Sequence, residues 1–540
     1  MIDRRSFIGI GTTAAGLLAA GGMTAALAED TKMTAGATVQ TRSGKVRGSL
    51  HGRVHAFKGI PYGASTAGER RFMPPAKVPE WTGVRDALEL GARAPQLLSS
   101  FHGQVIPEFE SMDRNEPMSE DCLMLNVWTP GPQAQARRPV MVWLHGGGYN
   151  SGSGGFICYD GAELARKHDV VAITVNHRLG ALGYLYLAEL GGERYADSGN
   201  LGNLDIVAAL EWVRDNIVAF GGDPANVTVF GQSGGGGKVS CLMAMPAAKG
   251  LFHRAIVESG AAIKGMPRDA ATRTARAFMA KLGLKPEEVA RLQHMPLEQL
   301  MAATEPGAGP PLNFAPVVDG GALPHDPFDP TAPALSADIP LLIGTVETEV
   351  TFFAHQALDP IDAPTLHAQV KRTLRHASDA QVDQLIAAYR AGRPKASNTD
   401  LYLIIASDAT FRAGVLTETE RKADQGKAPV YQYYFTWRSP VREGKLRTFH
   451  ALEIPFVFDN VDAAQSITGT GKDRYALASR MSGAWTAFAR SGNPNIKDLP
   501  HWQPFDTRRR ATMIFNDECR LVDDPHGAER RLLASLLGSA

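Results

Sequence analysis

One serine occupies a spacing that suits nucleophilic chemistry. The stretch 227–237 reads Val-Thr-Val-Phe-Gly-Gln-Ser-Gly-Gly-Gly-Gly, which places Ser233 in a G-x-S-x-G pattern directly after a β-branched and aromatic run. Glycines two positions before and after the serine let neighbouring backbone pass closely. A helix that begins after the serine would point free N–H groups at the same place. The pattern predicts a strand, a sharp turn that exposes the Ser233 hydroxyl, and a helix; a plain glycine-rich turn is the alternative.

A second glycine run has the composition of an oxyanion-binding loop. The sequence His145-Gly-Gly-Gly-Tyr149 follows the apolar run 139–144, which is typical of a strand buried on both faces. Backbone N–H groups can surround the negative oxygen of a tetrahedral intermediate only where side chains are absent. We therefore expect the amides of Gly147, Gly148 and Gly234 to form an oxyanion hole, with a flexible glycine turn as the alternative.

A serine nucleophile needs a base to accept its proton and an acid to orient that base. Behind a nucleophile elbow, the chain order is serine, then acid, then histidine. Glu349 follows the apolar run 339–343 by a few residues and is the predicted acid, with Glu347 and Asp319 as alternatives.

The predicted base is His450, which lies in a turn after the aromatic run 430–437. An isolated histidine among apolar residues is often structural. Of the rivals, however, His355 and His367 fall in a helical, polar segment and His501 in a proline-bounded one.

The elements that must position these residues alternate between strands and helices. Strands are predicted at 38–58 (a hairpin), 123–128, 139–144, 170–175, 227–230, 255–257, 339–343, 430–437 and 511–515, and helices at 161–168, 204–220 and 474–490. This alternation predicts an α/β fold with a mostly parallel sheet and helices on both faces, and catalytic groups at the carboxyl ends of the strands. Two helical, charged segments, about 264–311 and 355–425, are predicted insertions.

Composition and charge are those of a large globular protein. The chain has 540 residues, of which 44% are hydrophobic and 21% charged, and its formal net charge is zero. This balance gives no sign of a nucleic-acid or anionic membrane partner. No apolar run beyond the N-terminus is long enough to span a bilayer.

The N-terminus has the pattern of a twin-arginine signal. Arg4-Arg5-Ser-Phe-Ile8 precedes an Ala- and Gly-rich apolar run, and Ala26-Leu-Ala28 offers a small-x-small cleavage site. We expect residues 1–28 to be removed and the protein to be periplasmic or secreted by a bacterium after folding in the cytoplasm. An uncleaved anchor or a chance arginine pair is the alternative.

The cysteines and histidines show no metal pattern. Cys122, Cys158, Cys241 and Cys519 form no C-x-x-C pair, and no histidine cluster has metal-ligand spacing. No metal or cofactor is predicted, and sequence alone does not pair the cysteines.

Taken together, these motifs resemble the type-B carboxylesterase/lipase family, which includes bacterial para-nitrobenzyl esterases and the animal cholinesterases. Besides the two glycine motifs, the matching stretches are Ser119-Glu-Asp-Cys-Leu123, Asn176-His-Arg-Leu-Gly180, Gly199-Asn-Leu-Gly202, Ala219-Phe-Gly-Gly-Asp-Pro224, Leu251-Phe-His-Arg254, Ser259-Gly260 and His450-Ala-Leu-Glu-Ile-Pro-Phe456. The resemblance covers residues 38–525 and implies an α/β-hydrolase fold with helical insertions over an active-site gorge. It also implies Ser233 as nucleophile, Glu349 as acid and His450 as base.

The chain departs from the family pattern at several positions. Gln232 stands where the family usually has Glu before the serine, and Thr348-Glu349-Val350 replaces Asp-Glu-Gly. The usual disulfide partner of Cys122 is absent, because the preceding motif reads Ala94-Pro-Gln96, so a free thiol is expected. His177 replaces a family tyrosine, without a predicted effect.

The resemblance implies a serine carboxylic ester hydrolase that acts on a small-molecule ester through an acyl-enzyme. The oligomeric state is open, with a monomer as the default. We expect Ser259 to hydrogen-bond near Glu349, with a plain turn serine as the alternative. Tyr149, Phe352 and Phe353 are candidates to line the gorge, and packing is the equal alternative. A non-catalytic binding protein and a hydrolase of amides or lactones are the rival functions.

Overall fold

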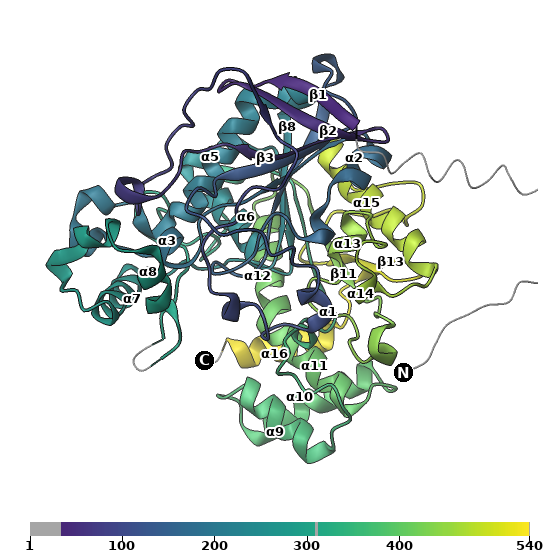
Figure 1. The fold of residues 1–540 in the computed structure, drawn as a ribbon. Coiled ribbons are helices and arrows are strands. Elements are labelled where there is room, and N and C mark those ends of the chain that lie inside the picture. Colours follow the sequence, from purple (N-terminus) through teal and green to yellow (C-terminus); the bar gives the residue numbers. More distant parts are fainter. Residues whose placement is uncertain (1–33, 308–310, 539–540) are drawn as a thin grey trace, which may run out of the picture.

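The computed structural model describes residues 34–307 and 311–538, in which thirteen strands form one sheet (Figure 1). The strand order is β1-β2-β3-β5-β7-β6-β8-β9-β10-β11-β12-β13, with β4 paired to β2. The strands are β1 Thr34–Gln40, β2 Lys45–His51, β3 Val54–Pro61, β4 Val84–Asp86, β5 Met124–Thr129, β6 Arg138–Leu144, β7 Val171–Val175, β8 Gly222–Gln232, β9 Arg254–Glu258, β10 Leu341–Val346, β11 Val430–Phe435, β12 Ala511–Phe515 and β13 Arg520–Asp523.

The middle of the sheet is parallel and its edges are antiparallel. Strands β7, β6, β8, β9, β10, β11 and β12 pair in parallel, whereas β1 to β5 and β13 join mainly by antiparallel pairing. The register sets Leu144 and Val257 on either side of Gly231. The carboxyl ends of β6, β8 and β9 therefore meet at one edge, where the glycine loop, Ser233 and Ser259 follow them.

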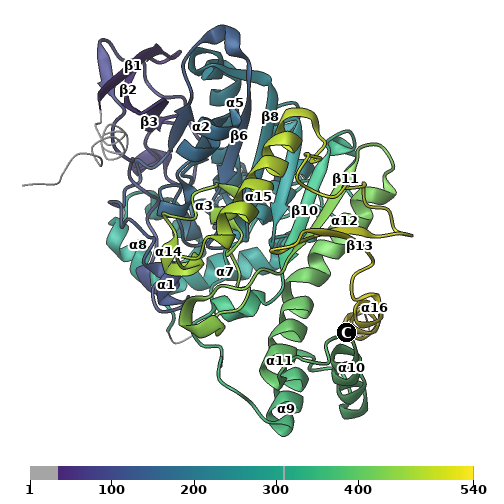
Figure 2. The ribbon, with the colours of Figure 1, turned by 90° about the vertical axis from the view of Figure 1, so that its right-hand side faces the viewer.

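Helices cover both faces of this sheet, as the alternating pattern predicts. Trp143 and Phe230 pack on the face covered by α2 (Ala162–His168), α13 (Ile454–Val457) and α15 (Asp473–Ser491). Val142 and Val229 pack on the opposite face, against α5 (Leu201–Asn216) and α6 (Gly234–Ala244). Figure 2 shows α15 lying along one side of the sheet with α5 beyond it. Because both faces are covered, every residue of strands β5, β7, β10, β11 and β12 is buried.

The two helical segments flank the sheet, but one of them also completes it. The first contains α7 (Arg268–Lys281) and α8 (Leu297–Thr304), which pack at one end of the molecule (Figure 1). The second contains α9 (Ala363–Thr373), α10 (Asp379–Gly392), α11 (Asn398–Ser407) and α12 (Ala413–Asp424). Since α12 contacts β10 and β11, its residues belong to the helical layer of the sheet rather than to an insertion.

The packed chain also extends beyond the predicted 38–525 at both ends. It begins with β1 and includes α16 (Gly527–Leu537), whose Leu533 and Leu536 pack on α10. The remaining short helices are α1 Pro107–Glu110, α3 Gly180–Tyr184, α4 Ala188–Gly191 and α14 Gln465–Thr468. The predicted signal segment 1–28 lies outside the described residues. No helix of the described chain combines the length and apolar character needed to cross a bilayer.

A buried ion pair fixes the loop that supports the glycine run. The Arg178 guanidinium, just after β7, donates to both carboxylate oxygens of Asp205 on α5 at 2.8 and 2.6 Å. Removing one partner of such a buried pair costs about 3–5 kcal/mol, because the other charge is left buried and unpaired. Two residues on, the Gly180 amide donates to the Tyr149 carbonyl at 2.7 Å and ties this loop to the glycine run.

Candidate active site

Ser233 lies on the sharp turn between β8 and α6 that its spacing predicts. Its φ of 58° and ψ of −126° are strained for a residue with a side chain. The turn is held because the Ser233 amide donates to the Glu258 carbonyl at 2.8 Å. A Cβ at Gly235 would collide with the Leu144 carbonyl, and one at Gly231 with the Gly235 backbone. The flanking glycines are therefore required by packing, and the turn leaves Ser233 half-exposed in a cavity.

Glu349 and His450 meet at the ends of β10 and β11. The His450 Nδ1 lies 2.6 Å from Glu349 Oε2, and both side chains are buried. The Val346 amide donates to the other Glu349 oxygen at 3.0 Å, and the His450 amide donates to the Glu349 carbonyl at 3.2 Å. These contacts orient the carboxylate toward Nδ1. The proton therefore resides on Nδ1, and Nε2 remains available as an acceptor.

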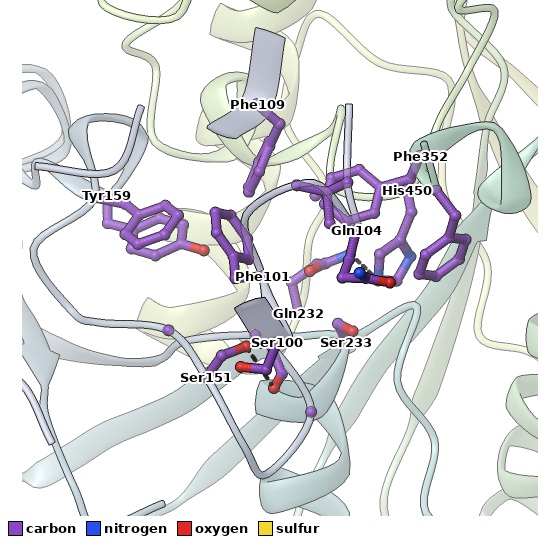
Figure 3. Close-up of a pocket in the computed structure, with 18 residues that line it drawn as sticks. Ser100, Phe101, Gln104, Phe109, Ser151, Tyr159, Gln232, Ser233, Phe352 and His450 are labelled. Carbon is purple, nitrogen blue, oxygen red and sulfur yellow. Dashed lines mark hydrogen bonds between the residues drawn. The ribbon is translucent and has the colours of Figure 1, made fainter. Parts of the chain in front are cut away.

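The available nitrogen of His450 contacts the side chain of Gln232. The carboxamide nitrogen of Gln232 lies 3.2 Å from His450 Nε2 and donates to it, as the dashed line in Figure 3 shows. No hydrogen bond joins Ser233 to His450 within the described structure, although both line the same cavity. Such a separation is common before substrate binds, because catalytic hydrogen bonds tighten in the substrate complex.

The three predicted oxyanion glycines face one another across the end of β6. Gly147 and Gly148 have φ values of 84° and 61°, a backbone region that favours glycine. A Cβ at Gly234 would collide with the Gly148 backbone, so the first turn of α6 contacts the loop directly. The Gly147 carbonyl accepts from the Ser151 hydroxyl at 3.2 Å and from the Ser151 amide at 3.1 Å. The loop is thus ordered, with its amides free for an oxyanion.

A mostly apolar cavity of about 170 Å³ adjoins these groups. Its aromatic wall is formed by Phe101, Phe109, Phe156, Tyr159, Phe352 and Phe353 (Figure 3). The described residues that line it include no Asp, Glu, Lys or Arg. A formal charge on a ligand would therefore be desolvated here without a partner, which favours an uncharged ligand.

Of the gorge candidates, Phe352 and Phe353 line the cavity and Tyr149 does not. The Tyr149 ring packs behind the glycine loop, 5.2 Å from the Tyr184 ring. For Tyr149 the packing alternative is therefore correct. Its hydroxyl lies against α6, where a Cβ at Gly237 would come within 2.7 Å of it.

Ser259 hydrogen-bonds to Glu453, a carboxyl group next to Glu349, and not to Glu349 itself. Its hydroxyl lies 3.4 Å from Glu453 Oε1, whereas the Glu349 oxygens are taken by Val346 and His450. Burial and the neighbouring Glu349 raise the pKa of Glu453 well above its usual value. The same burial raises the pKa of Glu258, which accepts from the Trp485 indole, to about 8.

Sequence reasoning did not assign Glu453 or Glu258 to the site, and a signal for each was present. Glu453 follows the base by three residues, and Glu258 ends a strand next to the elbow strand.

The rival acids and bases lie elsewhere. Asp319 accepts from the Gly321 and Leu323 amides and shapes a turn. The remaining rivals do not line the cavity: Glu347 faces Arg393 and Arg438, His355 packs on Phe353, His367 pairs with Asp383, and His501 is exposed.

The described residues contain neither a disulfide nor a candidate metal site. All four cysteines are free thiols, and Cys122, Cys158 and Cys241 are buried. Within the described ranges, no group of three His, Cys, Asp or Glu side chains could hold a metal ion.

Comparison with known proteins gives consistent relatives over the whole fold. A family model described as "Carboxylesterase family" matches residues 35–530. The chain is 36% identical to the para-nitrobenzyl esterase of Bacillus subtilis over 92% of its length and 98% of the relative's. It is 34% identical to the phenmedipham hydrolase of Pseudarthrobacter oxydans, over 88% and 94%. A crystal structure of a Geobacillus stearothermophilus carboxylesterase matches with a TM-score of 0.77 and 36% identity, over 92% and 99%.

The contact between Gln232 and His450 predicts a pH effect for Gln232→Glu. A carboxylate at this place would stabilise the imidazolium, so the acid limb of kcat/KM should move to higher pH by about one unit. If His450 accepts the Ser233 proton, the same charge should also increase kcat, because it stabilises the imidazolium that forms. The measurement is the pH–rate profile of both proteins on p-nitrophenyl acetate. Superimposable profiles would show that position 232 does not act on His450.

Proposed function

The chain belongs to the carboxylesterase family and is a carboxylic ester hydrolase, and we propose that it works through a covalent acyl-enzyme on Ser233. His450 is the general base and Glu349 orients it. The observation that carries this proposal is the 2.6 Å contact of His450 Nδ1 with Glu349. His450 lines the same cavity as Ser233, which is held on a strained turn. All of these groups come from one chain, so the chemistry needs no second copy.

Acylation begins when His450 exchanges its Gln232 partner for the Ser233 hydroxyl. The Ser233 Oγ then adds to the ester carbonyl carbon, its proton passes to His450 Nε2, and the carbonyl oxygen becomes an oxyanion. Glu349 stabilises the imidazolium through Nδ1. The imidazolium next protonates the alkoxy oxygen, the C–O bond breaks, and the alcohol leaves.

Deacylation repeats these steps with water. His450 takes a proton from water as its oxygen adds to the acyl carbon, and the second tetrahedral intermediate expels the Ser233 oxygen, which regains a proton. The oxyanion in both halves is held by the Gly147, Gly148 and Gly234 amides. Each such donor is worth about 3–4 kcal/mol in the transition state.

The cavity supports a small, uncharged ester as the substrate. A cavity of about 150 Å³ is large enough to hold benzene, and the one beside Ser233 measures about 170 Å³. Its phenylalanine wall suits a benzyl-sized or short aliphatic group. The name of the Bacillus subtilis relative, para-nitrobenzyl esterase, is consistent with an aromatic ester.

We propose further that the protein is exported by the twin-arginine route and works outside the cytoplasm. The support is the Arg4-Arg5 pair, the apolar run and the Ala26-Leu-Ala28 site. The four free thiols fit export after folding, since no disulfide has to form outside.

Substitution of the proposed triad should abolish turnover of short esters. We expect Ser233→Ala and His450→Ala each to lower kcat on p-nitrophenyl butyrate by about 10⁵–10⁶-fold. Wild type should prefer acetyl and butyryl over palmitoyl esters, because the cavity is small. The control is His501→Ala, which removes an exposed rival histidine and should keep full activity. A Ser233→Ala enzyme that retains a tenth of wild-type activity would exclude Ser233 as nucleophile.

Export can be tested by changing the arginine pair. Expressed in a bacterium with the twin-arginine system, wild type should give esterase activity in the periplasmic fraction, and the Arg4→Lys, Arg5→Lys double variant should retain it in the cytoplasm. Equal distribution of the two proteins between the fractions would refute this route.

A further inference from the structure

A lysine is buried directly behind the oxyanion loop. Lys238 lies on α6, five residues after Ser233, and its side chain is completely inaccessible to solvent. Within the described residues its ammonium donates to two backbone carbonyls, that of His145 at 3.1 Å and that of Gly148 at 2.9 Å, and to no carboxylate. A buried lysine without an acidic partner is unusual, because desolvating the charge is expensive.

The two accepting carbonyls bracket the glycines whose amides are the proposed oxyanion donors. His145 precedes the glycine run and Gly148 ends it, so one ammonium spans the loop from behind. Gly147 and Gly148 both have φ between 60° and 85°, and the loop between the two ties contains only glycines. Glycine backbone has many alternative conformations, so an external tie is needed to keep one of them.

We propose that Lys238 is a positioning residue that holds the Gly147 and Gly148 amides in the orientation that binds the oxyanion. The inference rests on the proposed function, since it assigns a task to a loop that acts only if Ser233 attacks a carbonyl. Lys238 touches neither substrate nor reacting atoms, because it does not line the cavity. It acts through the backbone of the loop.

The surroundings of Lys238 leave its positive charge uncompensated. The His145 and His177 rings stack at 4.7 Å, and burial together with Lys238 lowers the pKa of both, so they are neutral. Burial raises the pKa of Glu418, on the facing helix α12, to about 8. The Tyr149 ring lies 5.6 Å from the ammonium, a cation–π contact.

In addition to these hydrogen bonds, the protonated form of Lys238 places a positive charge behind the loop, which favours a developing oxyanion in front of it. Burial lowers the pKa of Lys238 to about 7, and the neutral amine still has two N–H groups for the two carbonyls. The tie therefore persists in either protonation state.

The chain offers a matched control for a purely structural lysine. Lys422 on α12 is also buried, and its ammonium donates to the Ser336 and Ala337 carbonyls at 2.7 and 2.9 Å and to the side-chain oxygen of Gln425 at 2.8 Å. These carbonyls do not line the cavity beside Ser233. Loss of either lysine removes two hydrogen bonds to backbone, but only Lys238 holds the oxyanion loop.

The test compares Lys238→Met with Lys422→Met in kinetics on p-nitrophenyl butyrate. Active sites are counted by the p-nitrophenol released on complete reaction with diethyl p-nitrophenyl phosphate, so misfolded protein does not enter kcat. We expect Lys238→Met to lower kcat by about 10–100-fold with KM changed less than threefold, because misplacing catalytic groups by about 1 Å has effects of this size. Lys422→Met should keep kcat within twofold. Lys238→Gln, which keeps a neutral donor, decides the question if Lys238→Met does not fold.

The inhibition constant Ki of a trifluoromethyl ketone distinguishes a positioning role of Lys238 from a general structural defect. Ser233 Oγ adds to the carbonyl carbon of this ketone, the serine proton passes to His450, and the ketone oxygen becomes a stable oxyanion. We expect its Ki to rise in Lys238→Met by the same factor by which kcat/KM falls, and to be unchanged in Lys422→Met. An unchanged Ki, or equal losses of kcat in both variants, would overturn the assignment of Lys238. A wild-type enzyme that the ketone does not inhibit at all would instead contradict the proposed function.

Discussion

The site depends on the crowding of backbone at the carboxyl end of β6, β8 and β9. At this edge the chain passes so closely that a Cβ at Gly231, Gly234, Gly235 or Gly260 would collide with neighbouring backbone. The hydrogen bond from the Ser233 amide to the Glu258 carbonyl closes the turn within that space. This packing of three strands holds the Ser233 backbone in its positive-φ conformation despite the strain.

The cavity beside Ser233 has an uncharged wall, and the ionisable groups Glu349 and Lys238 lie behind it. The cavity wall is aromatic, and Gln232 contributes an amide where a carboxylate would add charge. Charge is placed behind the reacting groups, with Glu349 against the imidazole and Lys238 against the oxyanion loop. Under the proposed mechanism, the imidazolium forms against Glu349 and the oxyanion forms in front of Lys238, which can carry a proton, while the cavity wall itself is uncharged.

Much of this arrangement could be predicted from local sequence. Ser233 and the two glycine loops are local patterns, and Glu349 and His450 follow from chain order and from the strands that precede them. Of the aromatic wall, only Phe352 and Phe353 were candidates from the sequence, because Phe101 and Phe156 come from loops and Phe109 from the four-residue helix α1, none of which shows periodicity.

Other parts of the structure depend on tertiary contacts that the sequence does not encode in a short pattern. Lys238 in the sequence is an ordinary helical lysine, and only packing of α6 against the loop makes it a buried tie. For the same reason α12 was predicted as part of an insertion: its charged sequence hides the face that packs on β10 and β11. The terminal strand β13 has only four residues and is held by pairing with β12, whereas the leucines of α16 are held by packing on α10.

The central claim is that the acyl group is carried by Ser233. The most direct measurement is acid-quench mass spectrometry of the wild-type enzyme mixed with p-nitrophenyl butyrate, followed by peptide mapping. The account predicts a butyryl mass increment on the peptide that contains Ser233, formed within the burst of p-nitrophenol and lost as turnover ends. A butyryl group on a peptide without Ser233, or turnover with no covalent adduct at any time, would contradict it.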